Sequence, residues 1–351
     1  MTKKELETPA LLVDLPRMES NLERMALFFR SVPAKLRPHF KNHKCPVLAA
    51  RQLEAGAIGI TCATLREAEC LVQHGVRSVL LANEITDGVK MRRLVELTRQ
   101  ADVIVCVDNQ KIVDELARTA ANGKAQVSVL VDVDVGACRC GVPPGKPAVR
   151  LAQFAISKGL RFRGLMGYEG GAVRKLPSPQ KEQAAAAAMR NLVETAALLR
   201  LEGINSEILS GGGTGTYSLS GRYPGVTEIQ AGTYLLMDTD YRKCCTDFDL
   251  TLTVLASVVS KTAGERIVVD AGLKSLSCEH GIPMVKDVPG LSIRRLTAEH
   301  GIIDLKDPSA PVDVGDKIEI WVHYSDATIN LHDRIWGIRD GQVEETFHVE
   351  G

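Results

Sequence analysis

The chain of 351 residues is too long for one ordinary hydrophobic core and too short for three, so its length favours two domains. Hydrophobic residues make up 45% of the sequence and aromatic residues only 4%, which indicates a core of mainly aliphatic side chains. Lysine plus arginine and aspartate plus glutamate both number 43. This neutral balance gives no electrostatic reason to expect binding to nucleic acid or to a membrane surface.

The nine cysteines are irregularly spaced, and no CxxC pair occurs among them. Such an odd, unpaired set indicates neither a disulfide framework nor a zinc ribbon, so we expect free thiols and a cytoplasmic protein. The first residues lack the apolar core of a signal peptide. No segment approaches the roughly 20 apolar residues that a membrane helix needs, so we expect no membrane association.

Residues 16–240 alternate between short apolar segments with strand character and segments with the spacing of amphipathic helices. This alternation predicts parallel strands covered by helices, and eight strands over this length fit an α/β fold of the (β/α)8 TIM-barrel type. A doubly wound sheet usually has fewer strands, and no GxGxxG motif follows the first strand. The predicted strands are residues 36–41, 59–64, 78–83, 102–108, 126–135, 162–170, 207–213 and 227–232.

After residue 240 the pattern changes to alternating or β-branched segments with glycine, proline and aspartate between them. The segments 250–260, 265–270 and 316–323 predict a second, C-terminal β domain. Residues 9–14 also have strand character and are compatible with joining it. We therefore predict a barrel domain at 16–240 and a β-strand domain formed by 241–351 together with 1–15.

Chemistry in such a barrel gathers at the carboxyl ends of the strands. Lys41 ends the first predicted strand, and a lysine there can form a Schiff base with an aldehyde. Residues 210–216, with the sequence SGGGTGT, follow the seventh strand, where barrels often bind phosphate through backbone N–H groups and hydroxyls. An amine that condenses with an aldehyde and a phosphate-binding turn are the minimum that pyridoxal 5′-phosphate requires.

Three further polar residues fall at strand ends. Arg139 follows the fifth strand and could donate to an anionic oxygen of a cofactor, Tyr168 ends the sixth, and Gln230 lies in the eighth. Ordinary structural interpretations compete with these: the lysine is one of many, the glycine run is a flexible turn, and the arginine forms a surface salt bridge. The residues alone leave both interpretations open.

A second polar group lies in the segment 323–333, HYSDATINLHD. Histidine and aspartate close together can bind a divalent metal ion. The alternative is a set of solvated polar side chains at a strand end.

Taken together, the motifs resemble one family. They are TPALLVD at 8–14, RPHFKNHK at 37–44, GACRCGV at 136–142, SGGGTGTY at 210–217, VDAGLK at 269–274 and EHG at 299–301. These segments resemble the D-threonine aldolases and D-serine dehydratases, pyridoxal-phosphate enzymes of the alanine racemase-like fold (fold type III). EIQAGTY at 228–234 and MDTDY at 237–241 resemble in particular the 3-hydroxyaspartate aldolases.

The resemblance extends from about residue 8 to the C-terminus and implies a homodimer whose active site is lined by residues of both domains. It also implies which residues contact the cofactor. These are Lys41 as the lysine that binds it, Arg139 near the phenolic oxygen, Tyr168 beside the cofactor, Gln230 facing the pyridine nitrogen, and Gly212, Gly213 and Thr214 in the phosphate turn.

One position departs from the family pattern. Family aldolases carry Gly-His-Cys-Asp before a Thr-x-Asn-x-x-Asp tail, and the histidine and aspartate bind an activating metal ion. This chain keeps the aspartate as Asp326, but Tyr324 stands at the histidine position and His323 precedes it. One residue along a strand reverses the side-chain direction. Either the backbone re-registers so that His323 and Asp326 bind Mg²⁺, Mn²⁺ or Zn²⁺, or the metal site is weakened and Tyr324 acts as a base.

These features predict a lyase that cleaves the Cα–Cβ bond of a β-hydroxy-α-amino acid, of the D-threonine or 3-hydroxyaspartate aldolase type, to give glycine and an aldehyde. Lys41, Tyr324 and His323 are the expected catalytic residues. The alternatives are a D-serine-type dehydratase, an amino-acid racemase, or a non-catalytic protein that binds pyridoxal phosphate. The expected partner is a small amino acid.

Overall fold

The computed structural model describes residues 1–173, 178–263, 265–307 and 310–350. The chain packs as two units. One consists of residues 25–41 and 46–232, and the other of residues 1–24, 42–45 and 233–350. Within the described residues, no helix combines the length and the apolar character that crossing a bilayer requires.

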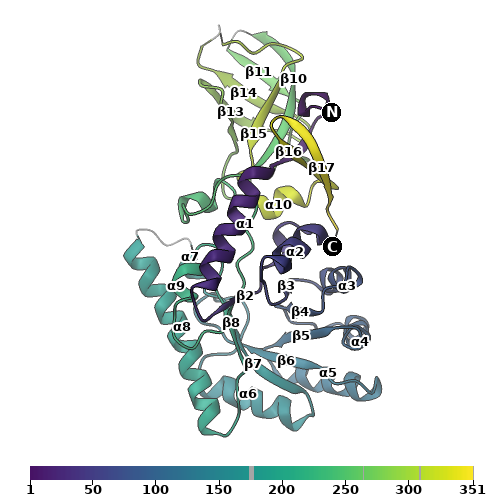
Figure 1. Cartoon of the computed structure of the whole chain (residues 1–351), viewed down its shortest axis with the longest axis vertical. Helices are drawn as coiled ribbons and strands as arrows, with labels where there is room; N and C mark the ends of the chain where they lie inside the picture. The colour runs from purple at the N-terminus through teal and green to yellow at the C-terminus, as the bar shows by residue number, and fades with distance from the viewer. Residues whose placement is uncertain (174–177, 264, 308–309, 351) are drawn as a thin grey trace. The chain divides into compact units, whose positions relative to one another are not determined.

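The unit of residues 25–41 and 46–232 is built on an eight-stranded parallel sheet, as predicted (Figure 1). Its first and last strands pair with each other, and a parallel bridge between His39 and Thr61 closes the sheet into a barrel. The strands are β2 (Lys35–Leu36), β3 (Ile60–Cys62), β4 (Ser78–Leu81), β5 (Asp102–Val107), β6 (Ser128–Asp132), β7 (Arg161–Gly167), β8 (Ile208–Gly211) and β9 (Glu228–Ile229).

Helices follow the strands in this unit, also as predicted. Some of these helices begin where the sequence supplies a capping side chain: Thr64 accepts from the N–H of Glu67, and Asn109 accepts from the N–H of Ile112. The helices are α2 (Pro46–Glu54), α3 (Leu65–Gln73), α4 (Gly88–Leu97), α5 (Gln110–Asn122), α6 (Lys146–Ser157), α7 (Gly170–Val173), α8 (Ser178–Leu201) and α9 (Tyr217–Ser220).

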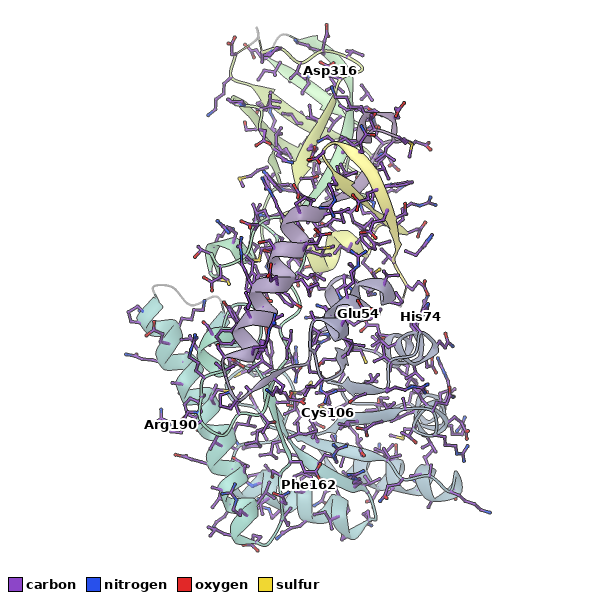
Figure 2. All side chains as sticks on the ribbon, viewed as in Figure 1. Glu54, His74, Cys106, Phe162, Arg190 and Asp316 are labelled. Atoms are coloured by element: carbon purple, nitrogen blue, oxygen red, sulfur yellow. The ribbon has the colours of Figure 1, made fainter. Side chains whose placement is uncertain are left out.

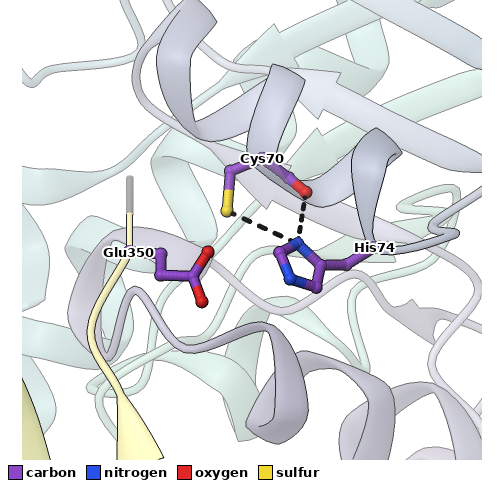
Figure 3. A group of neighbouring side chains, drawn as sticks. All are labelled: Cys70, His74 and Glu350. Atoms are coloured by element: carbon purple, nitrogen blue, oxygen red, sulfur yellow. Dashed lines mark hydrogen bonds between the residues drawn. The ribbon is translucent and has the colours of Figure 1, made fainter.

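Helix α3 ends with a side-chain cap of its own. Nδ1 of His74 lies 2.9 Å from the carbonyl oxygen of Cys70 and 3.8 Å from its sulfur (Figure 3). The ring thus adds a side-chain contact to a carbonyl that already accepts from the backbone N–H of His74 at 3.1 Å.

Aliphatic side chains and one thiol fill the barrel. Leu80, Ile104, Cys106, Leu130 and Met166 are at most 1% exposed and pack together, with Cys106 in the interior of the sheet (Figure 2). All nine cysteines are free thiols. The buried ones act as small apolar side chains, and burial raises the pKa of the Cys62 and Cys106 thiols well above the usual range.

A buried ion pair joins the two short strands that close the barrel. Nε of Arg37 donates to both carboxylate oxygens of Glu228, at 3.1 and 3.0 Å, and its Nη1 donates to Ser78 Oγ at 2.9 Å. The side chains of Arg37 and Glu228 are 6% and 2% exposed. The guanidinium therefore links β2, β9 and β4 inside the barrel.

The second unit is an antiparallel β structure that includes the N-terminal strand, as predicted from residues 9–14. Strand β1 (Ala10–Asp14) lies between β10 (Leu252–Ala263) and β16 (Arg334–Arg339), antiparallel to the first and parallel to the second. The remaining strands are β11 (Arg266–Val269), β12 (Met284–Val285), β13 (Leu291–Leu296), β14 (Gly301–Leu305), β15 (Lys317–Trp321) and β17 (Gln342–His348).

Two of the motifs meet in this unit. The carboxylate of Asp270 accepts a hydrogen bond from Thr8 Oγ1 at 2.5 Å and another from the N–H of Ser257 at 2.7 Å. The segment before β1 is thereby fastened to the end of β11. Both motifs have a structural role here, because they hold the N-terminal strand in the sheet.

The buried ion pair leads to a prediction about stability. Replacing Glu228 by Gln should lower the free energy of unfolding by about 3–5 kcal/mol, because the Arg37 guanidinium would remain buried without its counter-charge. The matched control is Glu96→Gln, which removes the exposed partner of Arg99 and should cost less than about 1 kcal/mol. Urea unfolding of both variants measures the difference, and equal losses would contradict the role given to the pair.

Candidate active site

Lys41 lies in a short 3-10 helix, η2 (Phe40–Asn42), and not at the end of a strand as predicted. Strand β2 ends at Leu36, and Pro38, which follows, has no N–H to donate to a sheet ladder. The segment before the lysine is still held at the barrel, because His39 donates its N–H to the carbonyl of Ala231 at 3.4 Å. The Lys41 side chain is exposed.

The glycine-rich turn after β8 is held by a carboxylate from the end of the sixth predicted strand. Glu169 is 1% exposed and follows β7. It accepts hydrogen bonds from the N–H of Gly212 at 2.9 Å, from Thr216 Oγ1 at 2.8 Å and from Ser220 Oγ at 2.5 Å. Gly213 N–H donates to Thr216 Oγ1 at 3.2 Å. The turn is therefore held in shape by hydrogen bonds within the barrel unit.

The hydrogen bonds of the turn determine which of its N–H groups and hydroxyls are available to a phosphate. The amides of Gly212 and Gly213 are both used within the turn, so these residues provide room for a ligand and not donors in this state. A Cβ on Gly213 would lie 3.3 Å from the Tyr168 ring, which leaves little space for any side chain. Thr214 is 2% exposed and contributes a hydroxyl to the same turn.

Arg139 and Tyr168 lie together, as their predicted positions at neighbouring strand ends require. The Arg139 guanidinium carbon is 5.8 Å from the centre of the Tyr168 ring. The loop of Arg139 is shaped by Asp134, whose Oδ1 accepts from the N–H of Gly136 and of Cys138, both at 3.0 Å. These hydrogen bonds lower the pKa of Asp134.

Gln230 follows β9 directly instead of lying within it. Its side chain is nearly buried, and Nε2 donates to Ser210 Oγ at 2.8 Å. Its backbone N–H donates to the carbonyl of Gly211. The amide of Gln230 is thus fastened beside the first residues of the glycine turn.

Three carboxylates at the ends of β4, β5 and β6 were missed by the sequence reasoning. Asp132 is 5% exposed, and burial, followed by repulsion from and hydrogen bonding to Glu84, raises its pKa to about 8 while Arg139 opposes the shift. Ligand atoms of Glu84, Asp108 and Cys140 lie within 4.8 Å of one another. Asp132 is the one charged residue in its apolar strand, and this was the available signal.

In the other unit, His323 is buried and hydrogen-bonds to groups of its own unit. It is 5% exposed. Its Nδ1 lies 2.7 Å from Thr239 Oγ1, and its Nε2 lies 3.2 Å from the carbonyl oxygen of His280. Among the described residues, no group of three or more His, Cys, Asp or Glu ligand atoms within 4.8 Å of one another includes His323 or Asp326.

The residues that follow His323 each contact a side chain from another part of this unit. Asp238 Oδ2 accepts from the N–H and the hydroxyl of Ser325 at 2.8 and 2.6 Å. Nδ2 of Asn42, the residue next to Lys41 in the chain, donates to Ser325 Oγ at 2.8 Å and to Asp326 Oδ1 at 2.7 Å. Tyr324 precedes helix α10 (Ser325–Ile329) and meets the His280 ring edge to face, with centroids 4.7 Å apart.

Comparison with known proteins agrees with this architecture. Residues 13–240 match the family described as alanine racemase, N-terminal domain, and residues 251–338 match a putative serine dehydratase domain. The chain is 37% identical to D-threonine aldolase from Arthrobacter sp. over 98% of this chain and 92% of that protein. It is 32% identical to 3-hydroxy-D-aspartate aldolase from Paracoccus denitrificans over 99% of this chain and 93% of that protein.

A solved structure gives the same result for the fold. The crystal structure of D-threonine aldolase from Filomicrobium marinum superimposes with a TM-score of 0.96 at 37% identity, covering 99% of this chain and 96% of that one. The class is therefore an α/β enzyme of the alanine racemase fold, with a parallel barrel and a mainly β C-terminal unit. Within that class, the chain belongs to the pyridoxal-phosphate family of D-threonine and 3-hydroxyaspartate aldolases and the related dehydratases.

The raised pKa of Asp132 predicts how stability depends on pH. The unfolded carboxyl ionises near its ordinary value of 3.8, whereas the folded one keeps its proton until about pH 8. The contribution of the protonated Asp132 carboxyl to the free energy of unfolding is therefore fully present below pH 4, and it is lost as the pH rises to about 8. Each unit of the shift corresponds to about 1.4 kcal/mol.

Asp132→Asn, which cannot ionise, should therefore gain stability relative to wild type between pH 4 and pH 8, with no further gain above that range. The exposed Asp114→Asn serves as the control, because Asp114 pairs with Lys158 at the surface. Denaturant unfolding across this range measures both variants. A difference between Asp132→Asn and wild type that does not vary with pH would refute the shift.

Proposed function

We propose that the protein is a pyridoxal-phosphate-dependent lyase that cleaves the Cα–Cβ bond of a β-hydroxy-D-amino acid to glycine and an aldehyde. The observation that carries this proposal is the similarity to a D-threonine aldolase over 98% of the chain. The activity is proposed for a homodimer, as the family resemblance implies.

The residues of the barrel fit the cofactor. The amine of Lys41 suits its aldehyde, and the buried turn at Gly212, Gly213 and Thr214 has the room and the hydroxyl that a phosphate needs. Arg139 would donate to the phenolic oxygen, with the Tyr168 ring beside the cofactor and the Gln230 amide facing the pyridine nitrogen. The bound cofactor supplies an electron sink for the pair released at Cα.

The β-hydroxyl proton requires an acceptor from this chain. When that proton is removed, a carbonyl forms at Cβ, the Cα–Cβ electron pair passes to Cα, and protonation of Cα gives glycine. We assign the acceptor role to Tyr324. Asp326 is a carboxylate of the kind that binds divalent ions, but the two ring nitrogens of His323 are occupied by Thr239 and His280. The donor set therefore does not fit a His/Asp metal site.

The dehydratase is the second candidate, because residues 251–338 match a putative serine dehydratase domain. Products separate the possibilities: incubation with D-threonine and with 3-hydroxy-D-aspartate should yield glycine and an aldehyde. Oxo acid and ammonia would indicate a dehydratase, and exchange of enantiomers a racemase. A protein that binds the cofactor and yields none of these products would be a non-catalytic binder.

The role of Lys41 can be tested by trapping. Borohydride treatment of the wild-type protein with the cofactor should leave about one cofactor covalently attached per chain, since an amine that condenses with an aldehyde becomes a stable secondary amine on reduction. Lys41→Ala should lose this incorporation. Lys44→Ala is the matched control, because Lys44 donates to Asn330 Oδ1, and it should retain it. Incorporation at the wild-type level in Lys41→Ala, measured by mass spectrometry, would exclude Lys41.

The role of Tyr324 can be tested against that of a metal ion. Exhaustive chelation should leave the cleavage rate unchanged, and Tyr324→Phe should lower kcat by about 100-fold or more, the usual contribution of a general base. If chelation abolishes cleavage and Mg²⁺, Mn²⁺ or Zn²⁺ restores it, the assignment of the proton to Tyr324 without a metal ion is wrong.

A further inference from the structure

His323 is held at both ring nitrogens by groups of its own unit. The carbonyl oxygen of His280 can only accept, so Nε2, 3.2 Å away, carries the hydrogen of that bond. Nδ1 then accepts from the Thr239 hydroxyl, 2.7 Å away. A metal ligand must offer a nitrogen lone pair, and in this neutral form none is left. The ring can instead fix the two segments that it joins.

One of these segments is a turn with an unusual backbone. His280 has φ +68° and Gly281 has φ +150°, so a histidine occupies the left-handed region that favours glycine. A Cβ on Gly281 would lie 2.5 Å from His323 Nε2. The turn therefore packs directly onto the His323 ring, and no side chain at position 281 would allow this approach. The hydrogen bond to the His280 carbonyl offsets part of the cost of this backbone conformation.

The same turn presents its side chain to Tyr324. The rings of His280 and Tyr324 meet at an interplanar angle of 86° with centroids 4.7 Å apart, which is a favourable edge-to-face geometry. Backbone φ and ψ of −134° and 108° make Tyr324 extended. Adjacent side chains in an extended segment point in opposite directions, so His323 is directed inward and Tyr324 away from it.

We propose that His323 is a positioning residue that fixes the direction of the Tyr324 ring through the His280 turn. His323 holds the His280 carbonyl, the carbonyl sets the turn, and the turn places the imidazole against the phenol. His280 is a second positioning residue in the same sequence of contacts. The proposal rests on the proposed function only for what Tyr324 does to a substrate; the positioning itself uses only contacts within this chain.

The first experiment measures the Tyr324 ring directly. The six tyrosines are replaced by 3-fluorotyrosine, and the ¹⁹F resonance that disappears in Tyr324→Phe is assigned to Tyr324. His280→Ala and His323→Ala should move this resonance in the same direction, because both remove the imidazole from its place against the ring. His323→Gln, whose amide can donate where Nε2 does, should keep the wild-type resonance. If His323→Ala leaves the resonance in place, the proposal is overturned.

Thr239→Val guards against an uninformative loss of folding in His323→Ala. It removes only the hydroxyl on Nδ1 and should move the Tyr324 resonance part of the way. His280→Phe keeps an aromatic edge and should restore the resonance toward the wild-type position. If His280→Phe and His280→Ala give identical resonances, the imidazole does not position Tyr324 by packing.

The second experiment uses the cofactor-loaded protein. His323→Ala should lower kcat by about 100-fold, as a small misplacement of a reacting group does, with KM little changed, and His323→Gln should recover most of the rate. Loss of rate in both variants, together with loss of bound metal ion, would make His323 a ligand and overturn the proposal. If the variants shift the Tyr324 resonance as expected but the protein has no lyase activity, the positioning role of His323 stands and only the proposed function is refuted.

Discussion

The barrel depends on the buried ion pair between Arg37 and Glu228. The strands that close the sheet, β2 and β9, have two residues each and share only two registered pairs, so backbone hydrogen bonds alone give a short seam. The Arg37 guanidinium adds two hydrogen bonds to the Glu228 carboxylate and a third to Ser78, and these side-chain bonds strengthen the short pairing of β2 with β9. Charges are costly to bury unless each has its partner. The pair therefore helps to hold the start of the segment that leads from β2 to Lys41.

Two other buried carboxylates, Glu169 and Asp132, have different roles because they have different hydrogen-bonding and charged neighbours. Glu169 accepts three hydrogen bonds and serves as the fixed point of the glycine turn. Asp132 is buried next to Glu84, and the charge of Arg139 only partly opposes the effect of burial and of Glu84, so the pKa of Asp132 is raised. The first carboxylate organises backbone, and the second adjusts the electrostatic surroundings of an arginine. Both lie just after or at the end of barrel strands.

The parts of the fold that follow from periodicity could be predicted from sequence. Eight strands alternating with helices, and an N-terminal strand that joins the β unit, reflect apolar spacing that packing preserves. Arg139 and Tyr168 could be placed together because parallel strands end at one edge. The 3-10 turn that carries Lys41 could not be predicted, because it depends on where Pro38 ends the strand and on contacts with residues 231–232.

The direction of His323 was also beyond the sequence. Both of its hydrogen-bond partners, Thr239 and His280, are more than 40 residues away, and neither forms a recognisable motif with it. Glu84 and Asp108 escaped notice for the same reason, since each is an ordinary acid until the barrel brings it close to Cys140. Local patterns specify elements, whereas the environment of a polar side chain is set by distant neighbours.

The turn held by Glu169 has a consequence for the equilibrium between free and loaded protein. When only a fraction of a protein is in the conformation that binds a ligand, the apparent affinity for that ligand falls in proportion to the fraction. Because Glu169 already fixes Gly212, Thr216 and Ser220 through three hydrogen bonds, a ligand that fits the turn in this shape would not have to order the loop when it binds. Its affinity would then not be reduced by a loop-folding equilibrium.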